Sequence, residues 1–173
     1  MKTTQPVHQS YSSKNTSVNS KRLPAIYNKI KWSSFSGQTV LDIGAGKYTQ
    51  HIKDFLSYWG IHYVPFDPYN CSAEDNLYAS CVHPDVVICS NVFNVIKEKE
   101  VIYDLYFMIT SFNVPFFITI YEGDKSWVGR ETKKDCYQRN ETIDAYDTTL
   151  CQYVGRSYHR HQSGLYNIYF CQI

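Results

Sequence analysis

The sequence predicts an α/β sandwich that is built around a mostly parallel sheet and ends in an antiparallel hairpin. Apolar runs of strand length alternate with amphipathic segments of helix length between about residues 39 and 121, a pattern typical of parallel strands joined by helices. Near the C-terminus, "YVGRSYHRH" and "LYNIYFCQI" flank Gly164 and have the pattern of a β-hairpin.

Four strands and three helical segments are expected before that hairpin. The strands are the apolar runs at 39–43, 61–66, 85–90 and 115–121. Apolar residues at helical spacing predict a helix over 50–59, which Gly60 would end, and a shorter helical segment over 23–32, which Pro24 would open. The next helix is predicted from the apolar positions Val95, Ile102, Leu105, Tyr106 and Ile109.

The chain divides into a short polar tail and one domain. Residues 1–20 are rich in Ser, Thr and Asn and nearly free of aliphatic side chains, so we expect a disordered tail or one that drapes over a neighbour. Residues 21–173 are long enough for a single domain with its own core.

Composition excludes several classes of protein. The 17 basic and 16 acidic residues give a net charge of +1, which is no footprint for tight, nonspecific nucleic-acid binding. No apolar run reaches the roughly 18 residues that a membrane helix needs, and no signal peptide opens the chain, so we expect no membrane contact and a cytoplasmic location. The six cysteines form no CxxC pair or Cys/His group, which predicts reduced thiols and no metal site.

The stretch "VLDIGAGKY", residues 40–48, places a glycine turn directly after the first strand. Of two phosphate-binding motifs tested at this turn, the Walker loop fails and the dinucleotide fingerprint fails in part. A Walker loop would need Gly in place of Leu41 and Ser or Thr in place of Tyr48, and a dinucleotide fingerprint would need Gly in place of Thr49. The turn therefore calls for a different ligand.

Two carboxylates indicate what that ligand carries. Ligands of parallel α/β sheets bind beyond the carboxyl ends of the strands, where Gly44 and Gly46 would let one approach the backbone. Asp42 would repel an anion there and suits a cation. Asp67, at the end of the second strand, is placed to accept hydrogen bonds from ribose hydroxyls. A cation and a ribose together describe S-adenosylmethionine (SAM).

These stretches, "VLDIGAG" and "VPFDPYN", resemble motifs I and II of the class I SAM-dependent methyltransferases, and the likeness covers about residues 23–173. It implies a Rossmann-like, seven-stranded sheet with a final antiparallel hairpin, and SAM as cofactor. Pro68 and Tyr69 would lie near the adenine. Tyr48 stands where many members carry a third glycine. By this resemblance the cofactor would contact Asp42, Gly44, Ala45, Gly46, Asp67, Pro68 and Ser90.

A narrower likeness concerns "DVVICSNVFNVIKEKEVI" and "YEGDKSWVGRETKKDCYQRN", which are similar to stretches of bacterial and phage methyltransferase-like proteins. This likeness fixes no substrate.

Catalytic residues are expected after the third and fourth strands, facing the transferred methyl group. Asn91 could accept from an amine there, although the prolines that mark base-amino methyltransferases are absent, and Asn94 is expected to cap the next helix. Residues 121–140 predict a long polar loop in which Glu122 would be the general base. The expected substrate-binding residues of this loop are Asp124, Trp127, Arg130, Gln138 and Asn140.

Two functions remain open from the sequence. One is a SAM-dependent methyltransferase of unknown acceptor, with nucleic acid slightly favoured over protein or small molecule. The other is a non-catalytic protein of the same fold that binds SAM and acts through a protein partner, for example in phage anti-defence. The expected state is a monomer or a homodimer.

Overall fold

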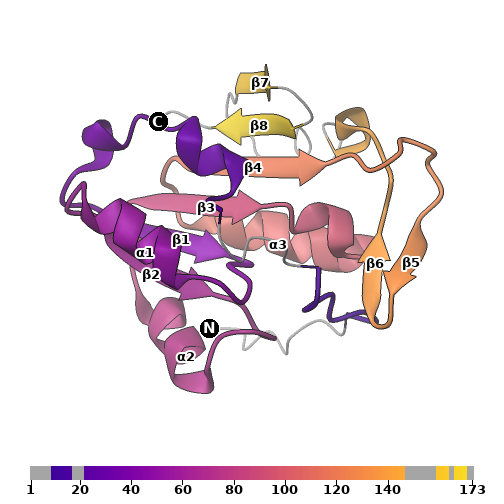
Figure 1. Ribbon diagram of the computed structural model, residues 1–173, viewed down its shortest axis with the longest axis horizontal. Coiled ribbons are helices and arrows are strands. Elements are labelled where there is room, and N and C mark those ends of the chain that lie inside the picture. The colour runs from indigo at the N-terminus through magenta and orange to yellow at the C-terminus, as the bar shows by residue number, and fades with distance from the viewer. Residues whose placement is uncertain (1–8, 17–21, 147–158, 164–165, 171–173) are drawn as a thin grey trace.

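The structure is a computed structural model that describes residues 9–16, 22–146, 159–163 and 166–170. Within these ranges, six strands form the main sheet in the order β2-β1-β3-β4-β8-β7 (Figure 1). The strands are β1 (Thr39–Ile43), β2 (His62–Phe66), β3 (Val86–Ser90), β4 (Phe116–Tyr121), β7 (His159–Ser163) and β8 (Tyr166–Phe170).

The pairing confirms the predicted sheet. β2, β1, β3 and β4 run parallel to one another, whereas β8 pairs antiparallel with both β4 and β7. The C-terminal hairpin is therefore added to the edge of a parallel sheet, as expected. The resemblance implied seven strands, and the part of the chain that the structure describes contributes six to this sheet.

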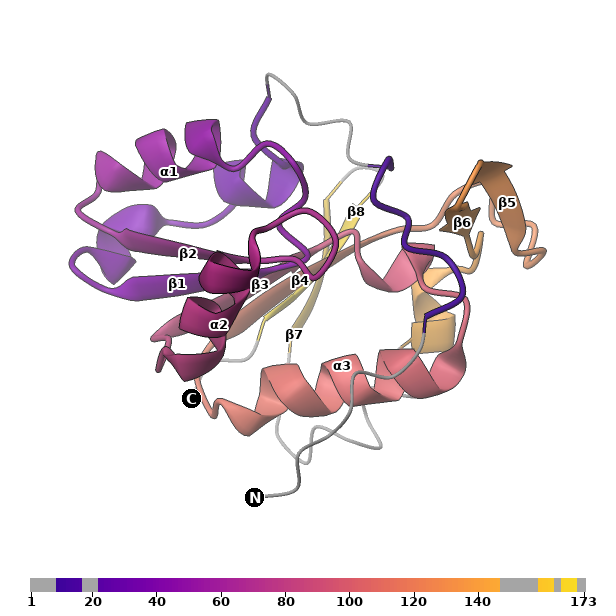
Figure 2. The same cartoon turned by 90° about the horizontal axis from the view of Figure 1, so that it is seen from below.

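Helices cover both faces of the sheet, as Figure 2 shows. The 3₁₀ turns η1 (Ala25–Asn28) and η2 (Trp32–Phe35) lie with α1 (Gln50–Ser57) on one face. The helices α2 (Ala73–Cys81) and α3 (Lys99–Ser111) lie on the other. Alternation along β1 serves both layers, because Val40 packs with the η1 and α1 side chains and Leu41 with those of α3.

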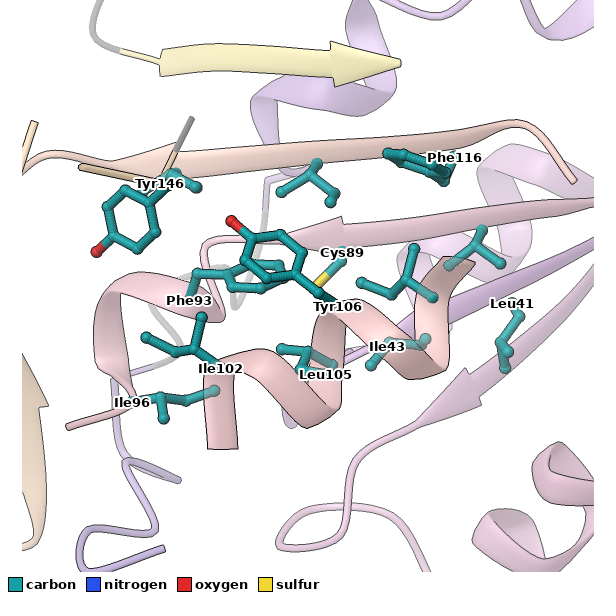
Figure 3. Packing of buried hydrophobic residues seen from close by; sticks show 14 of the residues in the cluster. Leu41, Ile43, Cys89, Phe93, Ile96, Ile102, Leu105, Tyr106, Phe116 and Tyr146 are labelled. Carbon is teal, nitrogen blue, oxygen red and sulfur yellow. The ribbon is translucent and has the colours of Figure 1, made fainter. Parts of the chain in front are cut away.

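The core beneath α3 is aromatic and aliphatic (Figure 3). The ring of Tyr106 on α3 stacks on Phe93, with 4.3 Å between ring centroids, and both side chains are fully buried. Ile43 and Cys89 supply the sheet side of the same cluster. This packing holds the segment after β3 rigidly against the sheet, which matters because that segment borders the site described below.

The helices differ from the prediction in three places. α2 was not expected, although Ser72 caps it by accepting from the Asp75 N–H at 3.0 Å. The helix α3 starts at Lys99, and Val95 lies instead in a separate 3₁₀ turn, η3 (Phe93–Val95). Asn94 is therefore not a helix cap, since it sits within η3 and its side chain bonds elsewhere.

Residues 121–140 are more ordered than the predicted polar loop. They contain a two-stranded sheet of β5 (Arg130–Lys133) and β6 (Cys136–Gln138). This sheet could not be predicted from apolar alternation, because all four β5 side chains are exposed and form no apolar face. The buried Cys136 anchors β6 to the domain.

Part of the expected tail is placed against the domain. Residues 9–16 lie beside β6, and Ser13 is only 4% exposed. In the described part of the chain, no helix is both long and apolar enough to cross a membrane.

Candidate functional site

A large cavity lies beyond the carboxyl ends of β1, β2 and β3, as parallel α/β sheets predict. Its volume is about 1610 Å³, more than a single drug-sized ligand needs. Every residue that the sequence assigned to the cofactor borders it. These are Asp42, Gly44, Ala45, Gly46, Asp67, Pro68 and Ser90.

The glycine turn is pressed between two neighbouring segments. The N–H groups of Gly44 and Ala45 donate to the Phe66 carbonyl at 2.7 and 3.2 Å. The N–H of Gly46 donates to Asp67 Oδ2 at 2.9 Å. These three amides are thus engaged by the end of β2, so the turn does not present them to a phosphate. A Cβ on Gly44 would lie 2.2 Å from Val92 Cγ2, which explains why this position needs glycine.

Asp42 is a buried carboxylate at the cavity wall. Its Oδ2 accepts from the hydroxyls of Tyr27 and Tyr63, each at 2.8 Å, and none of the ion pairs among described residues includes it. Burial raises the pKa of Asp42 to about 6, against the lowering effect of the two tyrosine hydrogen bonds. A carboxylate without a cation beside it is costly in a protein interior, so this one is suited to a cationic ligand.

Asp67 organises the turn after β2. Its Oδ1 accepts from the N–H groups of Tyr69 and Asn70 at 2.9 and 3.0 Å, and its Oδ2 accepts from Gly46 N and from Asn70 Nδ2 at 3.1 Å. These bonds fill the roughly four acceptor positions of a carboxylate. Asn70 provides the one donor that belongs to a side chain. A ribose hydroxyl would therefore reach Asp67 by displacing Asn70 Nδ2.

The segment after β3 forms another wall of the cavity. Asn91 borders the cavity in a left-handed conformation, with φ of 57°, and its N–H donates to the Thr119 carbonyl at 2.8 Å. Its Oδ1 is buried and accepts no hydrogen bond from the described residues. Ser90 Oγ lies 3.0 Å from Thr119 Oγ1 at the same strand end. The structure thus brings both expected residues to the cavity.

Asn94, which was expected to cap a helix, adds a second buried acceptor to this wall. Gln138 Nε2 donates to the Tyr121 carbonyl at 3.3 Å, so Gln138 Oε1 must accept, and it accepts from Asn94 Nδ2 at 3.1 Å. This relay fixes the orientation of the Asn94 amide. Its Oδ1 is left buried without a partner among the described residues. Unsatisfied buried acceptors are rare and mark a site for a donor.

Most of the 121–140 residues lie away from the cavity. Of the six that the sequence selected, Gln138 borders it, whereas Glu122, Asp124, Trp127, Arg130 and Asn140 do not. Asp124 pairs with Arg130 at 2.9 Å on the surface. Asn140 is buried and holds the 122–128 segment, because its Nδ2 donates to the Val128 carbonyl at 2.9 Å and its own carbonyl accepts from Trp127 N at 3.0 Å.

Glu122, the expected general base, does not border the cavity, and both of its carboxylate oxygens have partners outside it. Its Oε1 accepts from the buried Ile143 N–H at 2.8 Å, and its Oε2 pairs with Lys125 Nζ at 2.8 Å. Sequence reasoning placed it correctly after a strand, but the chain turns it away from the cavity. Among the described residues, the carboxylates at the cavity wall are Asp42, Asp67 and Asp104.

Glu122→Ala is expected to destabilise the protein without changing cofactor affinity. The substitution removes the hydrogen bond from the buried Ile143 N–H to the Glu122 carboxylate, and the loss of a hydrogen bond to a charged group costs about 1.5–3 kcal/mol. Thermal unfolding should show the loss, while SAM affinity measured by calorimetry should stay within about twofold of wild type. A tenfold loss of SAM affinity with unchanged stability would return Glu122 to the site.

Several residues at the cavity could not be recognised from the sequence as part of the site. Tyr27 and Tyr63 were visible only as apolar positions of a helical segment and a strand, yet they bond Asp42. Residues 9–16 belonged to a segment expected to be a disordered or draped tail, and Tyr137 was one aromatic of a polar loop, yet both border the cavity.

Comparisons with known proteins identify the fold. No protein-family model matches the chain, and no curated protein matches it. An O-methyltransferase family protein from Burkholderia thailandensis matches with a TM-score of 0.53 at 8% identity. The match covers 85% of this chain and 54% of that one, so this chain spans about half of its length. A SAM-dependent methyltransferase from Aquifex aeolicus matches with a TM-score of 0.51 at 13% identity, over 92% of this chain and 95% of that one.

The chain has the methyltransferase fold. A third solved structure, described as a DhpI–SAH complex, has a TM-score of 0.50 at 12% identity and covers 78% of this chain and 76% of its own. At these identities the likeness establishes the Rossmann-like architecture alone. The chemistry of the site has to be argued from its own residues.

Proposed function

We propose that this protein is a SAM-dependent methyltransferase. The observation that carries the proposal is Asp42, a carboxylate buried without a cationic partner among the described residues, beside a glycine turn whose amides are already engaged. A nucleotide or phosphate ligand would gain nothing from this pair of features, whereas a ligand with a positively charged methionine end would. A neighbouring structure whose description names SAH supports the same cofactor.

The described residues offer a place for each part of SAM, which would supply an electrophilic methyl group on its sulfonium. Asp42 and the glycine turn would hold the methionine end, and Asp67 would hold the ribose once Asn70 swings aside. Pro68 and Tyr69 border the cavity next to Asp67, where they would contact the adenine. These residues would align the cofactor, which is the main contribution a methyltransferase makes.

The acceptor end lies at the wall formed by Asn91 and Asn94. Their two buried, unpaired Oδ1 atoms suit an acceptor that carries N–H or O–H groups, and either amide oxygen would orient the lone pair of such a group toward the methyl. Neither the net charge nor the comparisons favour a nucleic acid, so no preference for that class is kept.

The ribose assignment is tested by Asp67→Ala. Wild type is expected to bind adenosine at least tenfold more tightly than 2′,3′-dideoxyadenosine, because only adenosine can offer hydroxyls to Asp67. The variant should bind both ligands equally and weakly, and should lose SAM and SAH affinity in parallel. Calorimetric titration measures each affinity.

Asn70→Ala is the matched control for that experiment. It removes one bond to the same carboxylate but leaves the acceptor in place, so the preference for adenosine should persist. Equal binding of the two nucleosides by wild type would contradict the ribose role of Asp67.

A non-catalytic SAM-binding protein is the second candidate. The observation in its favour is that Glu122, the expected general base, does not border the cavity. Transfer of a labelled methyl group from SAM to nucleic-acid, protein and small-molecule pools separates the two functions. Binding of SAM without label transfer to any pool favours the binder.

A further inference from the structure

We infer that residues 9–16 form a strap that covers part of the cavity and slows the exchange of SAM or SAH until it detaches from β6. This inference rests on the proposed function, since it concerns the same cavity. Five residues of the segment border that cavity together with Asp42 and Asp67. They are Gln9, Ser12, Ser13, Lys14 and Thr16.

One side of the strap is fastened to the β5–β6 hairpin. Ser13 N donates to the Asp135 carbonyl at 2.9 Å, and Ser12 N donates to Asp135 Oδ1 at 3.0 Å, with a further bond from Ser12 Oγ to Asp135 Oδ2. The ring of Tyr11 stacks on Tyr137, with centroids 5.3 Å apart. Figures 1 and 2 both show the segment, drawn in indigo, beside the β6 end of the hairpin.

Ser13 also ties the strap to the acceptor wall. Its Oγ accepts from Tyr137 N at 3.2 Å and donates to the Val95 carbonyl at 3.0 Å, so a single hydroxyl joins β6 to η3. Ser13 has φ of 49°, a conformation that a serine adopts only when its surroundings impose it. The strap is therefore fitted to this position, and its contacts are specific.

The other side of the strap reaches the cofactor wall. Lys47, which follows the glycine turn, donates from Nζ to Asn15 Oδ1 at 2.5 Å. The segment thus spans from the hairpin and η3 on the acceptor side to the glycine turn on the cofactor side. A ligand that occupies the space between these walls would have the strap across it.

The chemistry of the contacts makes the strap detachable. They are hydrogen bonds, one ring stack and a cation–π contact of Lys97 with the Tyr11 ring, and the segment holds no aliphatic side chain. A single hydrogen bond contributes only about 0.5–1.5 kcal/mol net, and the segment buries no apolar core side chain, so the strap can open without unfolding the core. Closure would exclude water from the transferred methyl, and opening would set the rate of product release.

The test compares SAH dissociation rates, measured by surface plasmon resonance, for two deletions. Removal of residues 1–16 is expected to raise the dissociation rate at least tenfold. Removal of residues 1–8, which leaves the strap intact, should keep the rate within twofold of the full chain. Equal rates for all three chains would overturn the strap. A full chain that binds no SAH would overturn the proposed function and the strap with it.

A point substitution guards against misfolding of the longer deletion. Asp135→Ala removes the fastening to Ser12 and should also raise the SAH dissociation rate at least tenfold. Asp124→Ala is the matched control, because Asp124 is a surface carboxylate of the same 121–140 segment that does not border the cavity. Dissociation rates within twofold for both substitutions would contradict the strap.

Discussion

Asp42→Asn is expected to stabilise the protein at neutral pH and to weaken SAM binding at the same time. The Asp42 pKa is raised from 3.8 to about 6 by burial, and a shift of this size corresponds to about 3 kcal/mol of free energy that the charged folded state loses. Asparagine keeps the shape and still offers Tyr27 and Tyr63 an acceptor oxygen, but it carries no charge.

The pH dependence follows from the direction of the shift. A carboxyl group whose pKa is higher in the folded state binds more protons folded than unfolded, so its charge destabilises the fold above pH 6. The advantage of the asparagine variant should be largest above pH 6 and should vanish as the pH falls below about 4. Thermal unfolding of both proteins from pH 4 to 8 measures it.

Cofactor affinity should move the other way. Loss of the carboxylate removes the attraction to the positively charged methionine end, and we expect SAM to bind about 10- to 100-fold more weakly, or about 1.4–2.7 kcal/mol. Asp54→Asn, on the exposed face of α1, is the control and should change neither quantity. If Asp42→Asn melts at a lower temperature than wild type at pH 7.5, the charge of Asp42 does not destabilise the folded state.

Gly44→Ala is expected to destabilise the protein strongly and to abolish SAM binding. Gly44 has φ of 75°, which costs a side-chain-bearing residue about 1–2 kcal/mol. The new Cβ would also lie 2.2 Å from Val92 Cγ2, so the segment after β3 must shift. Together we expect a loss of more than about 3 kcal/mol of unfolding free energy.

Gly37→Ala separates these two contributions. Gly37 has nearly the same φ, 76°, but a Cβ there would meet nothing within 4 Å. Gly37→Ala should lose only the stability that the positive φ costs an alanine. The difference in unfolding free energy between the two alanine variants then measures the contact with Val92.

Adding Val92→Ala to Gly44→Ala should recover part of the difference, which a double-mutant cycle by chemical denaturation would reveal. Equal losses for Gly37→Ala and Gly44→Ala would mean that the turn and the segment after β3 are not in tight contact.

Local sequence patterns predicted most of the fold. The apolar runs and helical spacings placed four parallel strands, α1 and the terminal hairpin correctly, because burial of apolar residues with a fixed period is what defines these elements. The patterns failed for elements whose formation does not depend on burial of an apolar face. The polar hairpin β5–β6 and the capped helix α2 carry weak or no apolar stripes, so they were missed.

The residues at the cavity also fall into those that the sequence predicted and those that it did not. The sequence by itself determined the Asp42 carboxylate, the glycine turn and Asp67, since strand ends and turns fix these positions locally. Only the tertiary structure decided which other groups join them. It turned Glu122 toward Ile143, bonded Tyr27 to Asp42, brought Asn94 to the cavity wall, and laid residues 9–16 beside β6. These contacts join residues from separate elements of the fold, and most of them satisfy polar groups. Because the geometry of polar groups leaves no periodic trace along the chain, only the folded structure reveals them.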